Sequence, residues 1–354
     1  MAVRGERRRL AAMIAAPVLL LLAVVAWRLG TDLRASRDHH AVGDGRDPRT
    51  YGFDLADLAY PESLLAAGGV PRDGLPTLDR PPLLTPAGVD SLNNAERGKY
   101  LVGADRVLGA VVRGEARCWP LRVLDWHEVC LDTLGGAPLA ATWSPLSGSA
   151  AVYGRLVEGD TLRLGVSGLL LNSNTLLFDR AASPSLWCQL TGEAVAGPRR
   201  GERLPRVPAV VTTWEHWRRD HPGTTVPAPA PTFKRRYQSR PYQTYRSGGR
   251  LRFPAAPLAG GGGPLDPLLI VETPAGRRVL DAARLVREAG PDGVWQGESD
   301  GVALRFRVAP QAPGEQPAVW PERAGSELVS GGGFAVYYAD RFAWHAFHPE
   351  DRLP

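Results

Sequence analysis

The sequence predicts an α+β protein that is mostly β: hairpin-rich, a β-meander with two related β-rich halves and few short helices, after one N-terminal transmembrane helix. Three observations support this fold class. The 354 residues include 40 glycines and 32 prolines, a share that disfavours long helices and favours turn-rich β structure. Hydrophobic residues make up 44% of the chain, enough for a packed core. Short strand-like runs between turns recur from residue 107 to 190 and again from residue 268.

The amino terminus predicts a membrane anchor over residues 10–28. Leu10 to Trp27 is an apolar run broken only by Pro17, close to the roughly 20 residues that span a bilayer. Because Arg7–Arg9 precede this run, we expect residues 1–9 to form a basic cytoplasmic tail and the body to lie outside, on the periplasmic or extracellular side. A cleaved signal peptide is the alternative, although no clean Ala-x-Ala site closes the run. In both interpretations, the rest of the protein is exported from the cytoplasm.

The net charge of +5 is concentrated in that amino terminus. Residues 1–28 carry five arginines and one glutamate, a net charge of +4, which leaves about +1 for the rest. A nearly balanced body lacks the basic footprint that binds a phosphate backbone, so we expect no nucleic-acid partner. The local run Lys234–Arg236 is expected to be a solvated turn rather than a binding patch.

The three cysteines, Cys118, Cys130 and Cys188, lie in apolar strand-like surroundings. We expect them to be small buried hydrophobic side chains. A Cys118–Cys130 disulfide is the alternative, and it requires a geometry that the sequence does not supply.

The first half is expected to be a series of hairpins that follows a polar juxtamembrane linker over residues 29–75. One short helix near residues 53–65 is expected within the linker. Three hairpins are predicted, each around a glycine-containing turn: 107–112 with 116–119, 129–134 with 138–143, and 150–156 with 161–166. Residues 121–126 suit a short helical turn, and strands at 176–178 and 187–190 complete the meander.

A helix is predicted after residue 212. Thr212-Thr-Trp-Glu215 fits a capping box, in which the Thr and Glu side chains satisfy free amide groups of the first helical turn. Trp214 and Trp217 share one face of this helix and are expected to anchor it in the core. His221-Pro222 ends the helix.

A weaker version of the first pattern begins near residue 268. Residues 269–280 repeat the strand–turn–strand scheme, a candidate helix follows at 282–288, and a strand is expected at 302–308. This order predicts a degenerate internal duplication. The body is therefore divided into a core at 76–254 and a second degenerate repeat at 255–354. The latter ends in a closing segment with a strand at 334–338 and an aromatic helical turn at 342–347.

A series of motifs in one order carries a family resemblance. They are Cys118-Trp-Pro120 through His127-Glu128, Thr142-Trp-Ser-Pro-Leu-Ser-Gly148, Gly165–Ser173, Asp179-Arg180, Ser185–Gln189, the loop Tyr237–Tyr245, and Phe342-Ala-Trp344. Together they resemble the bacterial family called domain of unknown function 3179 (DUF3179), over about residues 76–350. The resemblance implies no established activity.

The chain departs from this family at a cysteine pair. The family's Cys-Pro-Leu-Cys is here Ser144-Pro-Leu-Ser147. Two cysteines at that spacing suit a soft metal or thiol–disulfide exchange, and serine supports neither. We therefore expect no soft-metal centre here. His345 and His348 are spaced as two metal ligands can be but lack a clear third, so no metal ligand is predicted, and no cofactor is identified.

Polar side chains near predicted strand ends form the candidate site. His127, Glu128 and Ser147 are the candidate catalytic residues, with His127 as a buried structural histidine in the alternative. If residues 127–132 form a strand, His127 and Glu128 face opposite sides. The candidate ligand-binding residues are Ser167, Asn172, Asp179, Arg180 and Gln189, and a structural Asp179–Arg180 pair is the alternative. If the strand ends meet on one side, His127 should share a pocket with at least two of the other polar residues.

These residues predict a function class rather than a reaction. We expect a binding or accessory module of the cell envelope with a polar pocket around His127. It would take an envelope protein partner or a small polar ligand. The alternative is a hydrolytic or metal-dependent envelope enzyme that uses His127, Glu128 and a serine.

Overall fold

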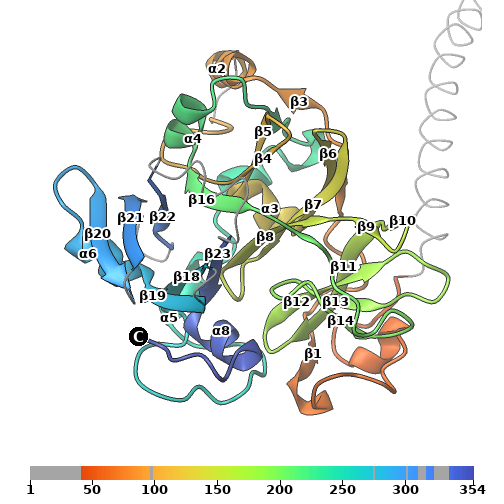
Figure 1. The fold of residues 1–354 in the computed structure, drawn as a ribbon. Helices are drawn as coiled ribbons and strands as arrows, with labels where there is room; N and C mark the ends of the chain where they lie inside the picture. Colours follow the sequence, from red (N-terminus) through yellow and green to blue (C-terminus); the bar gives the residue numbers. More distant parts are fainter. Residues whose placement is uncertain (1–40, 96–98, 274–275, 300–301, 310–315, 323–334) are drawn as a thin grey trace, which may run out of the picture. The chain divides into compact units, whose positions relative to one another are not determined.

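Figure 1 shows the fold in a computed structural model, which describes residues 41–95, 99–273, 276–299, 302–309, 316–322 and 335–354. The expected basic tail and membrane anchor lie outside these residues. Within the described ranges, no helix combines the length and apolar character needed to cross a membrane. The described elements are mostly strands with few short helices, which confirms the α+β, mostly β fold class.

A five-stranded antiparallel sheet contains the middle of the chain. Its order is β1 (Leu65–Ala67), β11 (Leu164–Leu171), β12 (Asn174–Asp179), β13 (Leu186–Cys188) and β14 (Ala194–Ala196). The β11–β12 turn places Asn172 and Ser173 at φ values of 50° and 55°, the left-handed pair that tight hairpins require.

The segment from residue 43 to 75 differs from the expected linker. It forms the 3-10 helices η1 (Pro48–Tyr51) and η2 (Glu62–Leu64), and strand β1 pairs with β11. Tyr51 and Phe53 are buried in the hydrophobic core beside Phe178. A few apolar side chains among polar residues are therefore enough to pack this segment against the core. The short helix expected near residues 53–65 is observed only as the 3-10 helix η2.

An eight-stranded sheet joins the two halves of the chain. Its path is β19 (Gly276–Asp281), β18 (Pro267–Thr273), β23 (Ala335–Asp340), β8 (Ser149–Gly154), β7 (Ala137–Ser144), β6 (Val129–Leu134) and β2 (Leu78–Asp79), and β15 (Arg206–Val207) also pairs with β8. Because β23 bridges β18 and β8, the expected boundary at residue 254 does not separate two folding units. Residues 43–354 form one compact unit.

The third predicted hairpin is replaced by a change of sheet. Strand β8 pairs with β7, whereas β11 pairs with β12, and the short hairpin between them consists of β9 (Leu156–Val157) and β10 (Asp160–Thr161). Arg155 holds this crossover: its buried guanidinium donates to the carbonyl oxygens of Leu139 at 2.9 Å and Leu162 at 2.6 Å. The turn was therefore located correctly, but its flanking strands enter different sheets.

A three-stranded sheet of order β16-β4-β5 carries the predicted helix. It contains β4 (Arg106–Val112), β5 (Glu115–Pro120) and β16 (Ala209–Thr213), followed by α4 (Trp214–Asp220). The N-cap is Thr213, whose hydroxyl accepts from the amide of His216, one residue later than predicted, because Thr212 pairs with Val107 in the sheet. Trp214 and Trp217 are both buried in the core.

The remaining elements surround these sheets. They are α2 (Pro86–Ala95), β3 (Leu83–Leu84) paired with β17 (Val226–Pro227), α3 (Leu121–His127), η3 (Pro231–Phe233), η4 (Arg236–Gln238), α5 (Gln243–Gly248), α6 (Ala282–Glu288), the sheet β20 (Val294–Ser299), β21 (Val302–Ala309) and β22 (Ala318–Pro321), and α8 (Arg341–Phe347).

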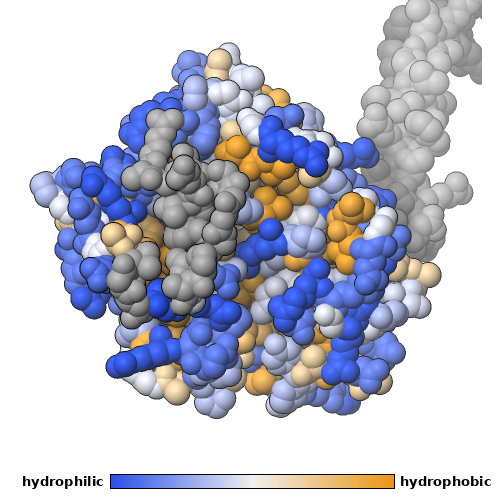
Figure 2. All heavy atoms as spheres, viewed as in Figure 1, coloured by the Kyte–Doolittle hydropathy of each residue, from blue (hydrophilic) through white to orange (hydrophobic). Residues whose placement is uncertain are grey.

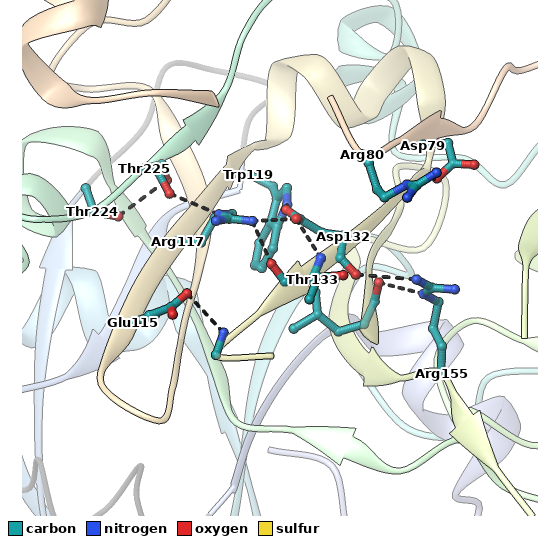
Figure 3. Close-up of polar contacts among 12 residues, drawn as sticks. Asp79, Arg80, Glu115, Arg117, Trp119, Asp132, Thr133, Arg155, Thr224 and Thr225 are labelled. Atoms are coloured by element: carbon teal, nitrogen blue, oxygen red, sulfur yellow. Dashed lines mark hydrogen bonds and ion pairs between the residues drawn. The ribbon is translucent and has the colours of Figure 1, made fainter. Parts of the chain in front are cut away.

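A buried charge pair ties β5 to β6 (Figure 3). The Arg117 guanidinium forms an ion pair with the Asp132 carboxylate, and both side chains are less than 10% exposed. Asp132 also accepts from the indole of Trp119 at 3.2 Å and the amide of Thr133 at 2.7 Å. Arg117 donates further to the hydroxyl of Thr225 at 3.0 Å. Every charge in this cluster therefore has several hydrogen-bond partners, as a buried ion pair needs.

All three cysteines are free and buried. Burial raises the pKa of the Cys118, Cys130 and Cys188 thiols, so they stay protonated. They therefore pack as small hydrophobic side chains, as expected, and the alternative Cys118–Cys130 disulfide is not formed.

Candidate functional site

A network of buried hydroxyl and amide side chains connects the eight-stranded sheet with the five-stranded sheet. Its members come from β7, from the turn after it, from the start of β8, from the start of β12 and from the residue after β13: Thr142, Ser144, Ser147, Ser149, Asn174, Thr175 and Gln189. Each is at most 1% exposed. A cluster of this kind survives in a core only when its donors and acceptors find one another.

The amide side chains of Asn174 and Gln189 organise the network. Asn174 Nδ2 donates to the hydroxyl oxygens of Ser147 at 2.8 Å and Ser149 at 3.0 Å. Ser149 Oγ donates to Gln189 Oε1 at 2.6 Å, and Gln189 Nε2 donates to Thr142 Oγ1 at 3.0 Å. Ser147 and Gln189, both predicted from the sequence, therefore come together in one site.

Glu128 joins the same network through Thr175. The Thr175 hydroxyl donates to Glu128 Oε2 at 2.9 Å and lies 3.2 Å from Ser144 Oγ. Burial raises the pKa of Glu128 to about 7; the Thr175 hydrogen bond opposes this effect and the charge of Asp125 adds to it. Glu128 reaches this position because it caps helix α3 in a left-handed conformation, with φ of 54°. It is the predicted site residue with the most perturbed environment.

His127 contacts a different set of residues. Its Nδ1 lies 2.6 Å from the Pro76 carbonyl oxygen and its Nε2 lies 2.6 Å from the Tyr237 hydroxyl. The ring packs against Phe233, and burial lowers the pKa of His127. Its two ring nitrogens therefore point to groups outside the network, whereas Glu128 points into it. The geometry matches the structural interpretation of His127, and His127 and Glu128 face different surroundings.

Ser167 and Asn172 hydrogen-bond to backbone groups outside the network. Ser167 Oγ donates to the Leu176 carbonyl oxygen at 2.6 Å across the β11–β12 pair. Asn172 occupies the left-handed turn after β11, and its Oδ1 accepts from the amide of Ala256 at 2.9 Å. Neither side chain hydrogen-bonds to the network of Asn174 and Gln189 in the described part of the chain. Their contacts link β11 to β12 and the turn to the segment at Ala256, and Asn172 Nδ2 is buried without a hydrogen-bond partner among the described residues.

Asp179 and Arg180 do not pair with each other. Asp179 accepts from the indole of Trp187 at 2.9 Å, which braces β12 against β13. Arg180 forms a bidentate ion pair with Asp73, with distances of 2.6 and 2.7 Å. The alternative of a structural Asp179–Arg180 pair is therefore wrong: Asp179 ends β12 and contacts β13, whereas Arg180 follows the strand and binds Asp73.

A small recess opens beside the buried network. It has room of about 50 Å³ and is lined in part by Trp143 and Pro145, which belong to β7 and to the turn that contains the network serines. Tyr242 and Gln243 from the start of α5 form another part of its wall. The end of β7 and the turn that follows it contain the serines that replace the family's cysteine pair. The side chains of this segment therefore belong partly to the buried network and partly to the wall of the recess.

Charged side chains surround the same recess. Arg106, Arg240, Arg246 and Asp125 all line it. Arg246 donates to both carboxylate oxygens of Asp340, at 2.6 and 2.8 Å. Asp125 Oδ1 accepts from the Trp143 indole at 2.8 Å. These arginines were not among the predicted site residues, although Arg240 lies within the motif loop Tyr237–Tyr245 and Arg246 directly follows it.

A group of three or more His, Cys, Asp or Glu side chains that could hold a metal ion is not found among the described residues. The serines at the positions of the family's cysteine pair have hydroxyl, amide and carbonyl partners: Ser144 lies beside Thr175, and Ser147 lies beside Ser149, Asn174 and the Ser144 carbonyl oxygen. Hydroxyl oxygens in such a setting suit hydrogen bonding rather than soft-metal binding.

Comparisons with known proteins identify the family. No curated protein and no solved structure matches the chain. The model of the family described as "Protein of unknown function (DUF3179)" matches residues 72–310, which include the buried network and most of the residues around the recess. Because this match covers more than half of the 354 residues, the chain belongs to the DUF3179 family.

Proposed function

We propose that this protein is a non-catalytic binding module of the cell envelope and takes a small polar ligand in the recess beside Trp143 and Pro145. The observation that carries the proposal is the state of the neighbouring serines. Ser144, Ser147 and Ser149 are fully buried, and each is engaged in hydrogen bonds with other network side chains. Hydroxyls held in this way stabilise a scaffold rather than attack a substrate.

The hydrolytic alternative has one specific observation in its favour. A hydrogen-bonded chain runs from Glu128 through Thr175 to Ser144, and the raised pKa of Glu128 suits a general base near neutral pH. Against this alternative, Ser144 is completely buried, so a substrate would reach it only if the surrounding side chains moved. The metal-dependent form of the alternative has no ligand cluster among the described residues to support it.

The surface in Figure 2 also favours a small ligand over a large apolar partner. On this face, hydrophobic residues gather in separate patches that are interrupted by hydrophilic side chains. A large obligate interface usually needs a more contiguous apolar area.

The proposal is tested with full-length protein in detergent. Small polar ligands of different charge are screened by thermal unfolding, and a fluorophosphonate probe reports any activated serine. We expect at least one ligand to raise the melting temperature, because a ligand that binds only the folded state stabilises it. We expect no labelling of Ser144 or Ser147. Stoichiometric labelling, lost in Glu128→Gln, would instead support the hydrolytic alternative, and a screen without any stabilising ligand would contradict a binding role.

We further propose that residues 10–28 anchor this module and hold its body outside the cytoplasm. The support is the apolar run with Arg7–Arg9 before it. A reporter fused after residue 60 should therefore be active only outside the cytoplasm. Replacing Arg7–Arg9 by glutamate is the matched control and should weaken this orientation. Cytoplasmic activity of the unmodified fusion would refute the localisation.

We also propose that the two β-rich halves descend from one duplicated unit. Two observations support this: a strand–strand–helix series recurs as β4-β5-α3 and β18-β19-α6, and a later strand pairs back on each, giving the orders β16-β4-β5 and β23-β18-β19. Helices α4 and α8 directly follow these returning strands. An experimental structure in which the two sets fail to superpose would contradict the duplication.

A further inference from the structure

We propose that residues 229–263 form a lid over the buried network, and that this lid opens as a unit and closes the recess when it docks. This segment, the strap, lies between β17 and β18 and contains the motif loop Tyr237–Tyr245. The inference concerns a movement of the protein and holds whichever ligand the recess takes. It is carried by where the strap is attached, by how it is attached and by the residues at its ends.

Two tyrosines of the motif loop attach the strap beside the network. The Tyr237 hydroxyl lies 2.6 Å from Nε2 of His127, the residue before Glu128. The Tyr245 hydroxyl donates at 2.8 Å to the carbonyl oxygen of Leu146, which lies in the turn after β7. Both tyrosines are buried. The motif loop therefore reaches two of the chain segments that supply network side chains.

The far end of the strap is attached to the turn between β11 and β12, which leads directly into the network. Ser173 Oγ donates to the carbonyl oxygen of Phe253 at 2.8 Å, and Asn172 Oδ1 accepts from the amide of Ala256 at 2.9 Å. The strap thus bridges three network segments: the end of α3, the turn after β7 and the turn before β12. These segments are far apart in the sequence, and one strap spans all of them.

Each of these attachments involves a side chain. The strap also has backbone hydrogen bonds, but those from Phe233 to Ala230 and from Arg246 to Tyr242 are local. One ion pair adds to the attachments, because Arg246 donates to both carboxylate oxygens of Asp340 at 2.6 and 2.8 Å. A segment held by a few side-chain contacts opens at a lower free energy than a core strand, whose backbone bonds break together.

The ends of the strap suit such a movement. It begins with Pro229-Ala-Pro231, and the prolines restrict the direction in which the chain leaves β17. It ends with the four glycines Gly260–Gly263. Gly260 has a φ of 88°, and among the described residues nothing fills the position that a Cβ would take at Gly260 or Gly261. Glycines in open space change their backbone angles at low cost, as a hinge requires.

The recess lies between the strap and the rest of the protein. Tyr242 and Gln243 of the strap form one part of its wall, and Trp143 and Pro145 form another. Trp143 and Pro145 flank Ser144 in the sequence. Opening of the strap therefore removes part of the wall of the recess and uncovers the segment that holds the network serines. The link to ligand entry rests on the proposed binding function, whereas the movement itself does not.

Trypsin measures this opening in full-length protein in detergent. The strap contains one lysine and six arginines, and a protease cuts a folded segment in proportion to its open population. We expect Tyr237→Phe and Tyr245→Phe each to raise the rate of cleavage within the strap about fivefold, since each variant removes one hydrogen bond of the closed state. If the strap opens as a unit, the rise is the same after Arg236 and after Arg252, which are both exposed.

Tyr51→Phe is the matched control. The Tyr51 hydroxyl is also bonded to a backbone carbonyl, that of Val70 at 2.6 Å, which lies outside the strap. This variant should leave cleavage within the strap unchanged. A rise confined to the site beside the substituted tyrosine would mean local fraying, and an equal rise in Tyr51→Phe would mean general loss of stability. Either result overturns the lid.

A thiol reports whether the opening strap uncovers the network. Ser144→Cys is treated with iodoacetamide without denaturant, and mass spectrometry identifies the labelled position. We expect slow labelling that rises about fivefold when Tyr245→Phe is added, as the cleavage rate does. Labelling that does not change with Tyr245→Phe, or that occurs only in denaturant, would show that the strap does not cover the network. No ligand is used, so a failure here leaves the proposed binding function standing.

Discussion

Replacing Asp132 by alanine should lower the free energy of unfolding by about 3–5 kcal/mol, because it leaves the Arg117 guanidinium buried without its counter-charge. The same substitution removes the acceptor of the Trp119 indole and of the Thr133 amide, so several buried donors lose their partner at once. Urea unfolding followed by tryptophan fluorescence measures the change.

A surface ion pair provides the matched control for this prediction. Asp79 pairs with Arg163 at 2.9 Å with both side chains more than a third exposed, so Asp79→Ala should cost less than about 1 kcal/mol. The double substitution Arg117→Met, Asp132→Leu should be less destabilising than Asp132→Ala, since no charge remains buried alone. An equal loss in the two aspartate variants would show that the buried pair has no special role.

Replacing Glu128 by glutamine should stabilise the protein at pH 8 by up to about 3 kcal/mol. Burial raises the pKa of Glu128 to about 7 in the folded protein from 4.5, and this difference corresponds to about 3 kcal/mol. Below pH 4.5 the carboxyl is protonated in both states and costs nothing. Between pH 4.5 and about 7 the unfolded protein releases this proton while the folded protein keeps it, so stability falls as the pH rises and the loss levels off above 7. Glutamine keeps the acceptor for Thr175 and carries no charge.

The stability of the two proteins should therefore converge toward pH 4.5 and diverge up to pH 8 in denaturant titrations. Glu158→Gln is the control, because Glu158 is exposed in the turn between β9 and β10. That variant should follow the unmodified protein at each pH. A Glu128→Gln gain that is independent of pH would mean that packing, and not ionisation, is responsible.

The fold could be predicted where two paired strands are neighbours in the sequence and a short turn joins them. The pairs β4–β5 and β6–β7 follow turns that contain glycine, and the strand pattern on each side is visible in the sequence. The separation of β8 from β11 was not predictable, because hydrogen bonds between distant strands decide it and a turn looks the same whether its arms pair or diverge. Tyr51 and Phe53 were missed for a related reason: two aromatic residues in a polar stretch show no periodicity.

The site was predictable in part. Ser147 and Gln189 come together because the motifs mark strand ends, and strand ends meet in a sheet protein. His127 does not join them, since the left-handed Glu128 turns the chain and sends the two side chains in different directions. Asn174 and Thr175 were missed as site residues, although they follow the Asn172–Ser173 turn directly. Recognition of that turn would have placed both at the start of β12.

The position of β23 has a consequence for how the chain reaches its final state. This strand, which ends at residue 340 of 354, pairs with both β18 and β8. Until it is in place, both neighbours keep unpaired backbone groups along one edge, and such edges promote aggregation. The largest sheet is therefore complete only after the residues of β23 have been synthesised, and contacts this distant in sequence form slowly. A polypeptide cut short before residue 335 would carry most of the family motifs and still be unable to shield its own core sheet.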